Sequence, residues 1–214
     1  MNDELRIISV KSKKNGQSCI ICLNDGELFE CSYDLVLKYK LGSGSNIPPD
    51  LLQELKKEQR IYVAKQSAYN YVSYKPRTEK QIRQKLRDKM FEKDEADLAL
   101  EFLMKFDLVD DAKYAKQFIT DYLKRKSSGK SKLMSELIIK GIDKSIAQQA
   151  LEEYYPHTET LELALKATKK KLRLIRHKPK EKQKESLIRF LQSAGFDWDI
   201  IRKVLKEIQF GDDE

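Results

Sequence analysis

The apolar positions of this chain recur with a period of about fifty residues. A short apolar cassette closes at Phe91, Ile142 and Phe196, and two further apolar residues follow each of them eight and nine positions later. Three copies at a regular period predict stacked helical units, because a helix-turn-helix unit of this size cannot bury its apolar face alone. We therefore expect an elongated array of repeats that recognises its partner along a surface.

One helix of each copy should end at the turn inside this cassette. Gly141 and Gly195 occupy the turn in the second and third copies, and glycine adopts the left-handed conformation of a helix end without steric cost. The first copy has Met90 at this position, so we expect a different turn geometry there, with Asp94 as the cap of the next helix.

From residue 51 onward the apolar spacing is helical. Thr78 and Gln81 form a capping box at the start of the second helix, and Trp198 should close the core of the last unit. The pattern predicts helices over residues 51–73, 78–90, 94–106, 110–126, 131–140, 143–154, 158–174, 181–193 and 197–208.

The first 48 residues differ from the rest, because their apolar residues form short β-prone runs. Asp25-Gly26 between the last two runs is a strong hairpin signal. Residues 42–49 contain two Gly, two Ser and two Pro, so we interpret them as a linker, and Asp50 should cap the following helix. The predicted strands cover residues 5–10, 18–23 and 28–32.

The expected fold is therefore mostly α, with three tandem three-helix repeats preceded by a small antiparallel β-hairpin module. We expect this module and its linker at residues 1–48, and the repeats at 49–107, 108–156 and 157–214, the last with an acidic C-terminal tail.

Composition agrees with a helical, highly solvated protein, because 36% of the 214 residues are charged and only 8 are Gly and 5 are Pro. No stretch approaches the roughly 18 consecutive apolar residues that a membrane span needs, and the N-terminus lacks the basic start of a signal peptide. We expect a cytoplasmic protein without a membrane partner, and a monomer, since the repeats can cover one another.

Three cysteines fall in the β-prone region. Cys19 and Cys22 have the spacing of a zinc or redox pair, but residues three apart on a strand point to opposite faces. With Cys31 alone remaining and both histidines far away, we expect buried reduced thiols and no metal.

The net charge of +8 permits a polyanionic partner, and its distribution indicates where that partner would bind. Residues 166–184 include ten basic residues and one acid, and a phosphate backbone would relieve their mutual repulsion while releasing counterions. A second basic cluster surrounds Ser127-Ser128-Gly129. Both runs could also be ordinary solvated surface. The candidate DNA-binding residues are Lys124, Arg125, Lys126, Lys130, Lys132, Lys166, Lys169, Lys170, Lys171, Arg173, Arg176 and Lys178.

No constellation for catalysis stands out. The acidic residues of the first repeat lie at predicted helix caps, without convergent spacing or a nearby histidine. Gly129-Lys130-Ser131 is not a phosphate loop, because the earlier glycine of that motif would fall at Lys124. We expect no enzymatic activity and no cofactor.

Four runs in the helical region carry a family resemblance. They begin with Pro76-Arg77-Thr78-Glu79, Leu108-Val109-Asp110-Asp111, Glu136-Leu137 before Lys140-Gly141-Ile142, and Arg189-Phe190-Leu191 before Gly195-Phe196. In this order and spacing, residues 60–208 resemble the RecX family of bacterial recombinase regulators, and the leading sheet is similar to an N-terminal extension of some members. Met90 and Ala194 depart from the family's usual glycine and basic residue, which places local turn geometry in question.

The resemblance implies a non-enzymatic protein that binds in the groove of the RecA filament on single-stranded DNA. It would inhibit ATPase activity, filament extension and strand exchange, and so act in homologous recombination, DNA repair and the SOS response. Duplex DNA is a further candidate partner. Because interface energy concentrates in a few anchors, we name Arg77, Arg83 and Tyr114 as candidate contacts with the recombinase.

Two other functions fit the same residues. A stand-alone DNA-binding protein, architectural or regulatory, would bind naked DNA with steep salt dependence and ignore the recombinase. A helical scaffold for another acidic protein would have little affinity for either.

Overall fold

The computed structural model describes residues 5–14, 16 and 18–208. It is mostly helical with a small antiparallel sheet in its N-terminal region, as the sequence predicts. The chain divides into two compact units: Met1–Lys75 with Ile82–Leu108 form the first, and Pro76–Gln81 with Val109–Glu214 form the second.

The sheet has three strands in the order β1, β2, β3, and both neighbouring pairs are antiparallel. Ile21 at its centre is opposite Val10 on one side and Phe29 on the other. The predicted turn at Asp25-Gly26 joins the last two strands, and Gly26 adopts a φ of 88° there. The strands are β1 (Ile7–Ser12), β2 (Ser18–Leu23) and β3 (Leu28–Ser32).

The three thiols lie in this sheet. Cys19 and Cys31 are buried and oppose one another, whereas Cys22 is half-buried on the opposite face. Burial raises the pKa of Cys31 to about 12 and also raises the pKa of Cys19. Because the thiolate is the reactive form, such thiols behave as small core hydrophobes.

The segment that we predicted as a linker is part of the fold. The Ile47 side chain is buried, its N–H donates to the Leu5 carbonyl at 2.7 Å, and the Ile7 N–H donates to the Ser45 carbonyl at 2.9 Å. The Gly, Ser and Pro residues of this segment predict turns correctly. They do not reveal that Ile47 is buried by contacts with residues far away in the sequence. A short helix that the sequence analysis missed, α1 (Tyr33–Lys38), follows β3 directly.

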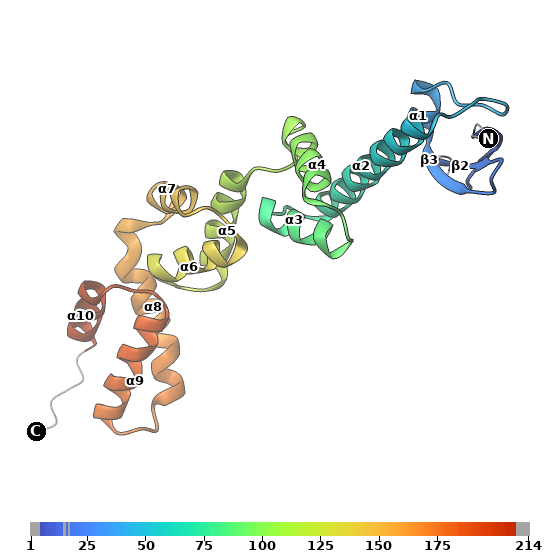
Figure 1. Ribbon diagram of the computed structural model, residues 1–214. Helices are drawn as coiled ribbons and strands as arrows, with labels where there is room; N and C mark the ends of the chain where they lie inside the picture. Colours follow the sequence, from blue (N-terminus) through green and yellow to red (C-terminus); the bar gives the residue numbers. More distant parts are fainter. Residues whose placement is uncertain (1–4, 15, 17, 209–214) are drawn as a thin grey trace, which may run out of the picture. The chain divides into compact units, whose positions relative to one another are not determined.

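Helix α2 (Pro49–Tyr74) joins the sheet to the first repeat (Figure 1). Its early residues Leu52 and Leu55 complete the core under the sheet, and the buried Gln59 accepts a hydrogen bond from the Ser32 N–H at 2.8 Å. The predicted cap was wrong: Asp50 lies in the first turn, and Pro48 is the N-cap.

The first repeat combines the second half of α2 with α3 (Glu79–Asp88) and α4 (Lys93–Lys105). Helix α4 packs along α2, and Arg60 Nε donates to Glu95 Oε1 at 2.5 Å. This hydrogen bond lowers the pKa of the buried Glu95 carboxyl below its ordinary value. Glu95 also completes a capping box with Glu92, so Glu92 is the cap of α4, and our prediction of Asp94 was wrong.

The turn at Met90 does not differ from the glycine turns, contrary to our expectation. Met90 adopts a φ of 62°. Its N–H donates to the Arg87 carbonyl, and the N–H of the next residue, Phe91, donates to the Leu86 carbonyl. The turns at Gly141 and Gly195 have the same pair of hydrogen bonds. Methionine tolerates this conformation at a steric cost, and its side chain is 80% exposed, so nothing crowds it.

The second unit holds the other two repeats. In both repeats an Asp side chain caps the last helix, Asp143 by accepting from the Ser145 N–H and Asp197 by accepting from the Ile200 N–H. The helices are α5 (Asp111–Arg125), α6 (Lys130–Lys140), α7 (Lys144–Tyr154), the short 3-10 helix η1 (His157–Glu159), α8 (Thr160–Ile175), α9 (Lys180–Ser193) and α10 (Trp198–Glu207).

Two joints of the same kind lie within the second unit. The Thr78 hydroxyl, just before α3, donates to the Lys140 carbonyl at 2.8 Å, and the Gly129 N–H, just before α6, donates to the Ala194 carbonyl at 2.8 Å. Each acceptor directly precedes the turn glycine of the next repeat. In both cases the residue just before a middle helix therefore docks on a closing turn within the second unit.

Candidate nucleic-acid interface

The basic cluster between α5 and α6 is largely engaged within its own repeat. Lys132 pairs with Glu136 at 3.1 Å and Lys124 with Asp121 at 3.5 Å, while Lys130 forms an ion pair with Glu152. The hydrogen bond from Lys130 lowers the pKa of Glu152. Of the five predicted residues in this cluster, Lys124, Arg125 and Lys126 are exposed, and Lys130 and Lys132 are half-buried.

The tip of this α5–α6 hairpin is also buried. The Tyr155 hydroxyl donates to the Ser128 carbonyl at 3.1 Å, and Gly129 is buried against the third repeat. A Cβ atom added to Gly129 would lie 2.0 Å from the Gly195 carbonyl oxygen. The tip is thus an internal packing surface, which leaves little of it for a partner.

The basic cluster of α8 has the opposite character. Lys166, Lys169, Lys170 and Arg173 are exposed and follow the i, i+3, i+4, i+7 spacing that places side chains on one helix face. We call these four residues the α8 stripe. Among the residues that the structure describes, none of the four forms an ion pair.

The same helix positions in the second repeat do not form such a stripe. The buried Ala115 and Ala164 are equivalent, and counting from them, the stripe corresponds to Gln117, Thr120, Asp121 and Lys124 of α5. One basic residue out of four remains, and it pairs with its neighbouring aspartate. The stripe is therefore specific to the third repeat.

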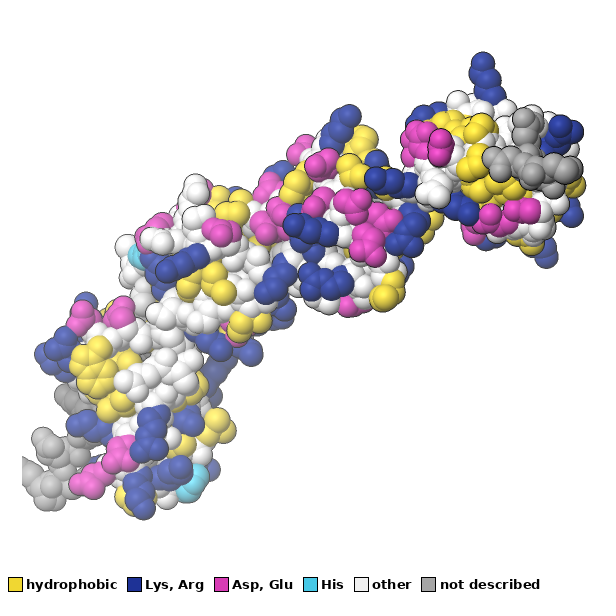
Figure 2. All heavy atoms as spheres, in the orientation of Figure 1, with side chains coloured by type: hydrophobic (Ala, Val, Ile, Leu, Met, Phe, Trp, Pro, Cys, Tyr) yellow, Lys and Arg dark blue, Asp and Glu magenta, His cyan; other side chains and the backbone are white. Residues whose placement is uncertain are grey.

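The α8–α9 hairpin is also longer than its counterparts. Buried Ala and Leu residues are 22 positions apart in the first two repeats, at Ala64 and Leu86 and at Ala115 and Leu137, but 27 apart in the third. The extra five residues lengthen the basic end of the hairpin. Lysine and arginine side chains gather over this end of the second unit (Figure 2).

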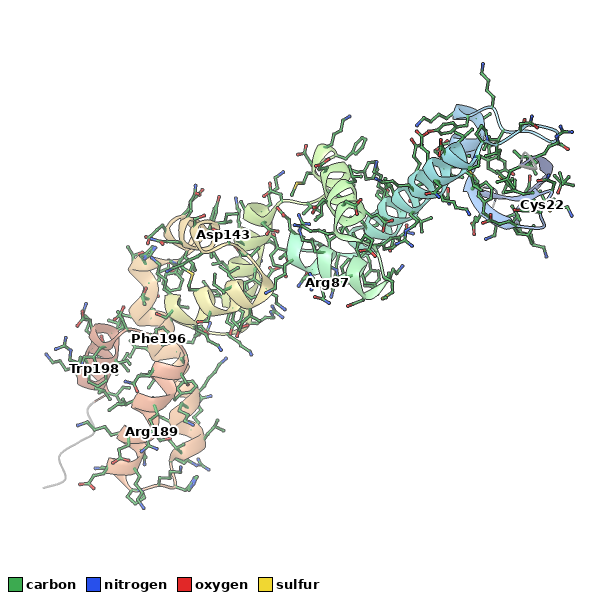
Figure 3. All side chains as sticks on the ribbon, viewed as in Figure 1. Cys22, Arg87, Asp143, Arg189, Phe196 and Trp198 are labelled. Atoms are coloured by element: carbon green, nitrogen blue, oxygen red, sulfur yellow. The ribbon has the colours of Figure 1, made fainter. Side chains whose placement is uncertain are left out.

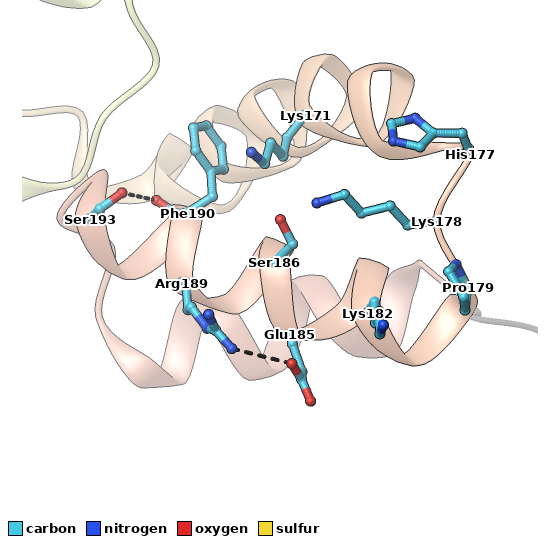
Figure 4. A pocket seen from close by; sticks show the side chains of 10 residues that line it. All are labelled: Lys171, His177, Lys178, Pro179, Lys182, Glu185, Ser186, Arg189, Phe190 and Ser193. Carbon is cyan, nitrogen blue, oxygen red and sulfur yellow. Dashed lines mark hydrogen bonds and ion pairs between the residues drawn. The ribbon is translucent and has the colours of Figure 1, made fainter.

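An open groove of about 910 Å³ lies between α8 and α9 (Figure 4). Lys171 and Lys178 point into the space between the helices, and the Lys171 ammonium lies 5.4 Å from the centre of the Phe190 ring. Arg189 is paired with Glu185 at 3.2 Å, and Glu185 is the acidic residue of the lining. The basic, histidine and aromatic side chains of the lining are Lys171, His177, Lys178, Lys182, Arg189 and Phe190.

The sequence analysis placed Lys171 and Lys178 in this region but missed the groove. Lys182, Arg189 and Phe190 were not among the predicted binding residues. The signal that would have found them is the spacing of 27 between Ala164 and Leu191, because an insertion between two buried anchors must project from the repeat. Arg176, which we predicted as a DNA-binding residue, is exposed at the end of α8.

The three candidate contacts with a recombinase are divided between the two units, with Arg83 in the first and with Arg77 and Tyr114 in the second. Arg83 is half-buried in the first unit, where it forms an ion pair with Asp97. Tyr114 is half-buried in the core of the second repeat, and its ring stacks on Phe118 with centres 6.3 Å apart. Arg77 is half-buried in the segment before α3.

Trp198 does not close the core of the last repeat, contrary to our prediction. It is the first residue of α10, and 49% of its surface is exposed (Figure 3). The nearby Phe196 is buried instead, because it follows the turn at Gly195 and packs with Leu191 and Ile201. Exposed tryptophan is uncommon on a protein surface and frequent at interfaces.

Neither metal ligation nor a membrane span has structural support in the part of the chain that is described. Within residues 5–14, 16 and 18–208, no cluster of three or more His, Cys, Asp or Glu side chains could hold a metal ion. None of the helices described is long and apolar enough to cross a membrane.

Family models cover most of the helical region. Residues 64–103, 110–151 and 158–205 match the first, second and third three-helix domains of RecX, respectively. These matches agree with the three repeats that the structure contains.

Relatives that match nearly the whole chain are also RecX proteins. The chain is 31% identical to the regulatory protein RecX of Clostridium perfringens strain 13 over 206 residues, which covers 95% of this chain and 96% of the relative. It is 33% identical to the regulatory protein RecX of Clostridium acetobutylicum over 210 residues, which covers 96% and 97%.

Two crystal structures have the same fold. RecX from Lactobacillus salivarius superposes with a TM-score of 0.63 at 26% identity, covering 71% of this chain and 98% of that one. A regulatory protein RecX superposes with a TM-score of 0.78 at 22% identity, covering 94% and 99%. The chain therefore belongs to the RecX family of regulatory proteins.

Proposed function

We propose that this protein is a negative modulator of the RecA recombinase. It binds in the groove of the RecA filament on single-stranded DNA and inhibits ATPase activity, filament extension and strand exchange. Membership in the RecX family supports the recombinase as the partner. The protein acts by binding and has no catalytic role of its own.

The observation that carries the DNA part of this proposal is the α8 stripe. Like charges three and four positions apart destabilise a helix by about 0.2–0.5 kcal/mol per pair. Phosphates placed along the stripe would remove this repulsion and release counterions, which makes the stripe suited to a nucleic-acid backbone. The proposed DNA contacts are the stripe, Lys171, Arg176 and Lys178, with a smaller share from Lys124, Arg125, Lys126, Lys130 and Lys132.

The proposed recombinase contacts lie elsewhere on the chain. Arg83 lines an open hollow of the first unit together with Arg87, Phe91 and the carboxylates of Glu92 and Asp97, and such a mixed surface of charges and an aromatic ring suits a protein partner. Arg77 and Tyr114 remain candidates for the same role, each half-buried. A protein held by DNA contacts and by protomer contacts together would block the addition or movement of protomers.

The test is ATP hydrolysis by a RecA recombinase on single-stranded DNA while this protein is titrated in. Inhibition well below one protein per recombinase is expected, since competition for bare DNA would require near-saturating amounts. Direct binding to the same DNA without recombinase is measured at the same salt concentration. Tight binding to naked DNA with no inhibition would overturn the proposal and favour a stand-alone DNA-binding protein.

A further inference from the structure

The open groove between α8 and α9 combines cations with an aromatic ring. Lys171, Lys178, Lys182 and Arg189 line it with one carboxylate, Glu185, so the charged side chains of the lining have a positive sum. Phe190 is half-buried at the same site, with part of its ring accessible. The lining therefore provides both an electrostatic attraction for an anion and a flat apolar surface.

We infer that this groove binds a single strand of nucleic acid, with the lysines on consecutive phosphates and a base stacked on Phe190. Proteins that hold single strands combine a positively charged groove with aromatic side chains on which bases stack. This inference rests on the proposed function, because that function supplies the single-stranded DNA that the groove would bind.

The geometry favours a single strand over a duplex. The groove between α8 and α9 has a volume of about 910 Å³. This is too small to receive a double helix, whose major groove alone is about 12 Å wide and 8.5 Å deep. A duplex could contact only the outer rim of the hairpin and could not place a base on Phe190. A single strand can enter with its bases unpaired.

The ligand chemistry also follows from the mixture of side chains. An acidic peptide would be attracted by the same lysines, but its Asp and Glu side chains have no ring that could stack on Phe190. The Lys171 ammonium lies 5.4 Å from the ring centre, so it can hold a phosphate while the base beside that phosphate reaches the ring. The longer hairpin of the third repeat creates the groove, and neither of the other repeats has this insertion.

The first experiment measures binding of a fluorescent oligothymidylate to the full chain as a function of salt concentration. Lys178→Gln with Lys182→Gln is compared with Lys203→Gln and Lys206→Gln, two exposed lysines of α10 that do not line the groove. Each phosphate contact on a single strand contributes about 0.7 to the slope of log K against log salt, so the groove variant should lose about 1.4. The α10 variant should retain the wild-type slope.

The second experiment tests the aromatic contact. Phe190→Leu should weaken binding by about 5-fold to 150-fold, as expected for one stacked base, and should leave the salt slope unchanged. Because Phe190 also packs against the core of the repeat, an abasic oligonucleotide with wild-type protein is the companion measurement, and it should bind more weakly by a similar factor.

Three outcomes would overturn the inference. One is a groove variant whose slope equals that of the α10 variant, and another is an abasic strand that binds as tightly as oligothymidylate. The third is competition by duplex DNA or polyglutamate at the same concentration as by the single strand. None of these measurements includes recombinase, so the groove can fail while inhibition of ATP hydrolysis stands, and the reverse also holds.

Discussion

The α5–α6 and α8–α9 hairpins occupy equivalent places in successive repeats, yet they use their basic residues differently. In the first, Lys130 and Lys132 pair with carboxylates of their own repeat, and the tip packs against the next one. In the second, the α8 stripe has no ion pair among the described residues, and the tip is extended by five residues and exposed. Charge density in a sequence therefore does not by itself identify a binding surface. The position of the nearest carboxylate and of the neighbouring repeat decides whether a lysine is available.

The largest expected effect is a loss of stability from a substitution that adds a side chain at the buried tip of the α5–α6 hairpin. Gly129→Ala places a Cβ 2.0 Å from the Gly195 carbonyl oxygen, so the backbones of two repeats must separate. We expect the second unit to lose about 3 kcal/mol or more of its free energy of unfolding. Urea denaturation followed by circular dichroism measures this loss.

Gly42→Ala is the matched control, because the added Cβ would meet only Ser45 Oγ at an ordinary 3.9 Å. It should change the stability by less than about 0.5 kcal/mol. Equal effects for the two variants would contradict the assignment of the α5–α6 tip as a packing surface.

The next largest expected effect is a loss of affinity for single-stranded DNA when lysines of the two basic clusters are replaced. Lys169→Glu with Lys170→Glu and Lys171→Glu should weaken single-stranded DNA binding by about 100-fold at moderate salt, because it replaces attraction with repulsion at the stripe and groove. Lys130→Gln with Lys132→Gln should weaken binding by less than about 3-fold, since these lysines already pair with carboxylates. Fluorescence anisotropy gives both values.

A triple reversal at Lys144, Lys203 and Lys206 makes the same change of net charge at exposed positions outside both clusters. If it weakened binding as much as reversal of the α8 residues, the protein would be responding to total charge, and the stripe would have no special role.

Sequence periodicity predicted most of the fold, because burial repeats with the period of the helix and strand that cause it. The strands and all of the principal helices lie near their predicted positions. Two of the errors share one cause: Ile47 and Trp198 were judged by local composition or by sequence position, and tertiary contacts decide their burial. Met90 was judged by the rarity of its conformation, and its exposed side chain makes that conformation tolerable.

The candidate site was predicted only in part. The α8 stripe follows from sequence alone, since helical spacing places its four residues on one face. The engagement of Lys130 by Glu152 could not be predicted, because the two residues are 22 positions apart and meet through the packing of α6 on α7. The role of Phe190 was not predicted either, because Phe190 lies in a run of apolar residues whose other members form the core of the repeat.

The joint that buries the α5–α6 tip has a counterpart before α3. A milder substitution there measures how much the joint contributes to the free energy of unfolding. Thr78→Val removes the hydrogen bond to the Lys140 carbonyl and the cap on the Gln81 N–H, at 2.8 and 3.2 Å. We expect a loss of about 1–2 kcal/mol in the free energy of unfolding. Thr120→Val is the control, because the Thr120 hydroxyl is exposed and bonds only to its own helix. A loss at Thr78 no larger than at Thr120 would contradict the role of the joint.

The smallest effect is a shift in one titration. Lys130 holds the pKa of Glu152 below its ordinary value through a hydrogen bond. Because the folded-state pKa is depressed, this pair contributes stability above the ordinary pKa of glutamate, and the contribution is lost as the pH falls through the folded-state value. Lys130→Gln should raise the pKa of Glu152 toward its ordinary value, as followed by NMR. An unchanged pKa would mean that Lys130 is free to bind DNA.

Acetylation of lysine side chains, read by mass spectrometry with and without single-stranded DNA, tests the central claim most directly, because each lysine reports separately. The comparison of the hairpins predicts that DNA slows acetylation of Lys169, Lys170, Lys178 and Lys182 several-fold and slows that of Lys130 and Lys132 much less, while the rates at Lys203 and Lys206 stay the same. Protection of Lys130 and Lys132 without protection of the α8–α9 lysines would contradict the account.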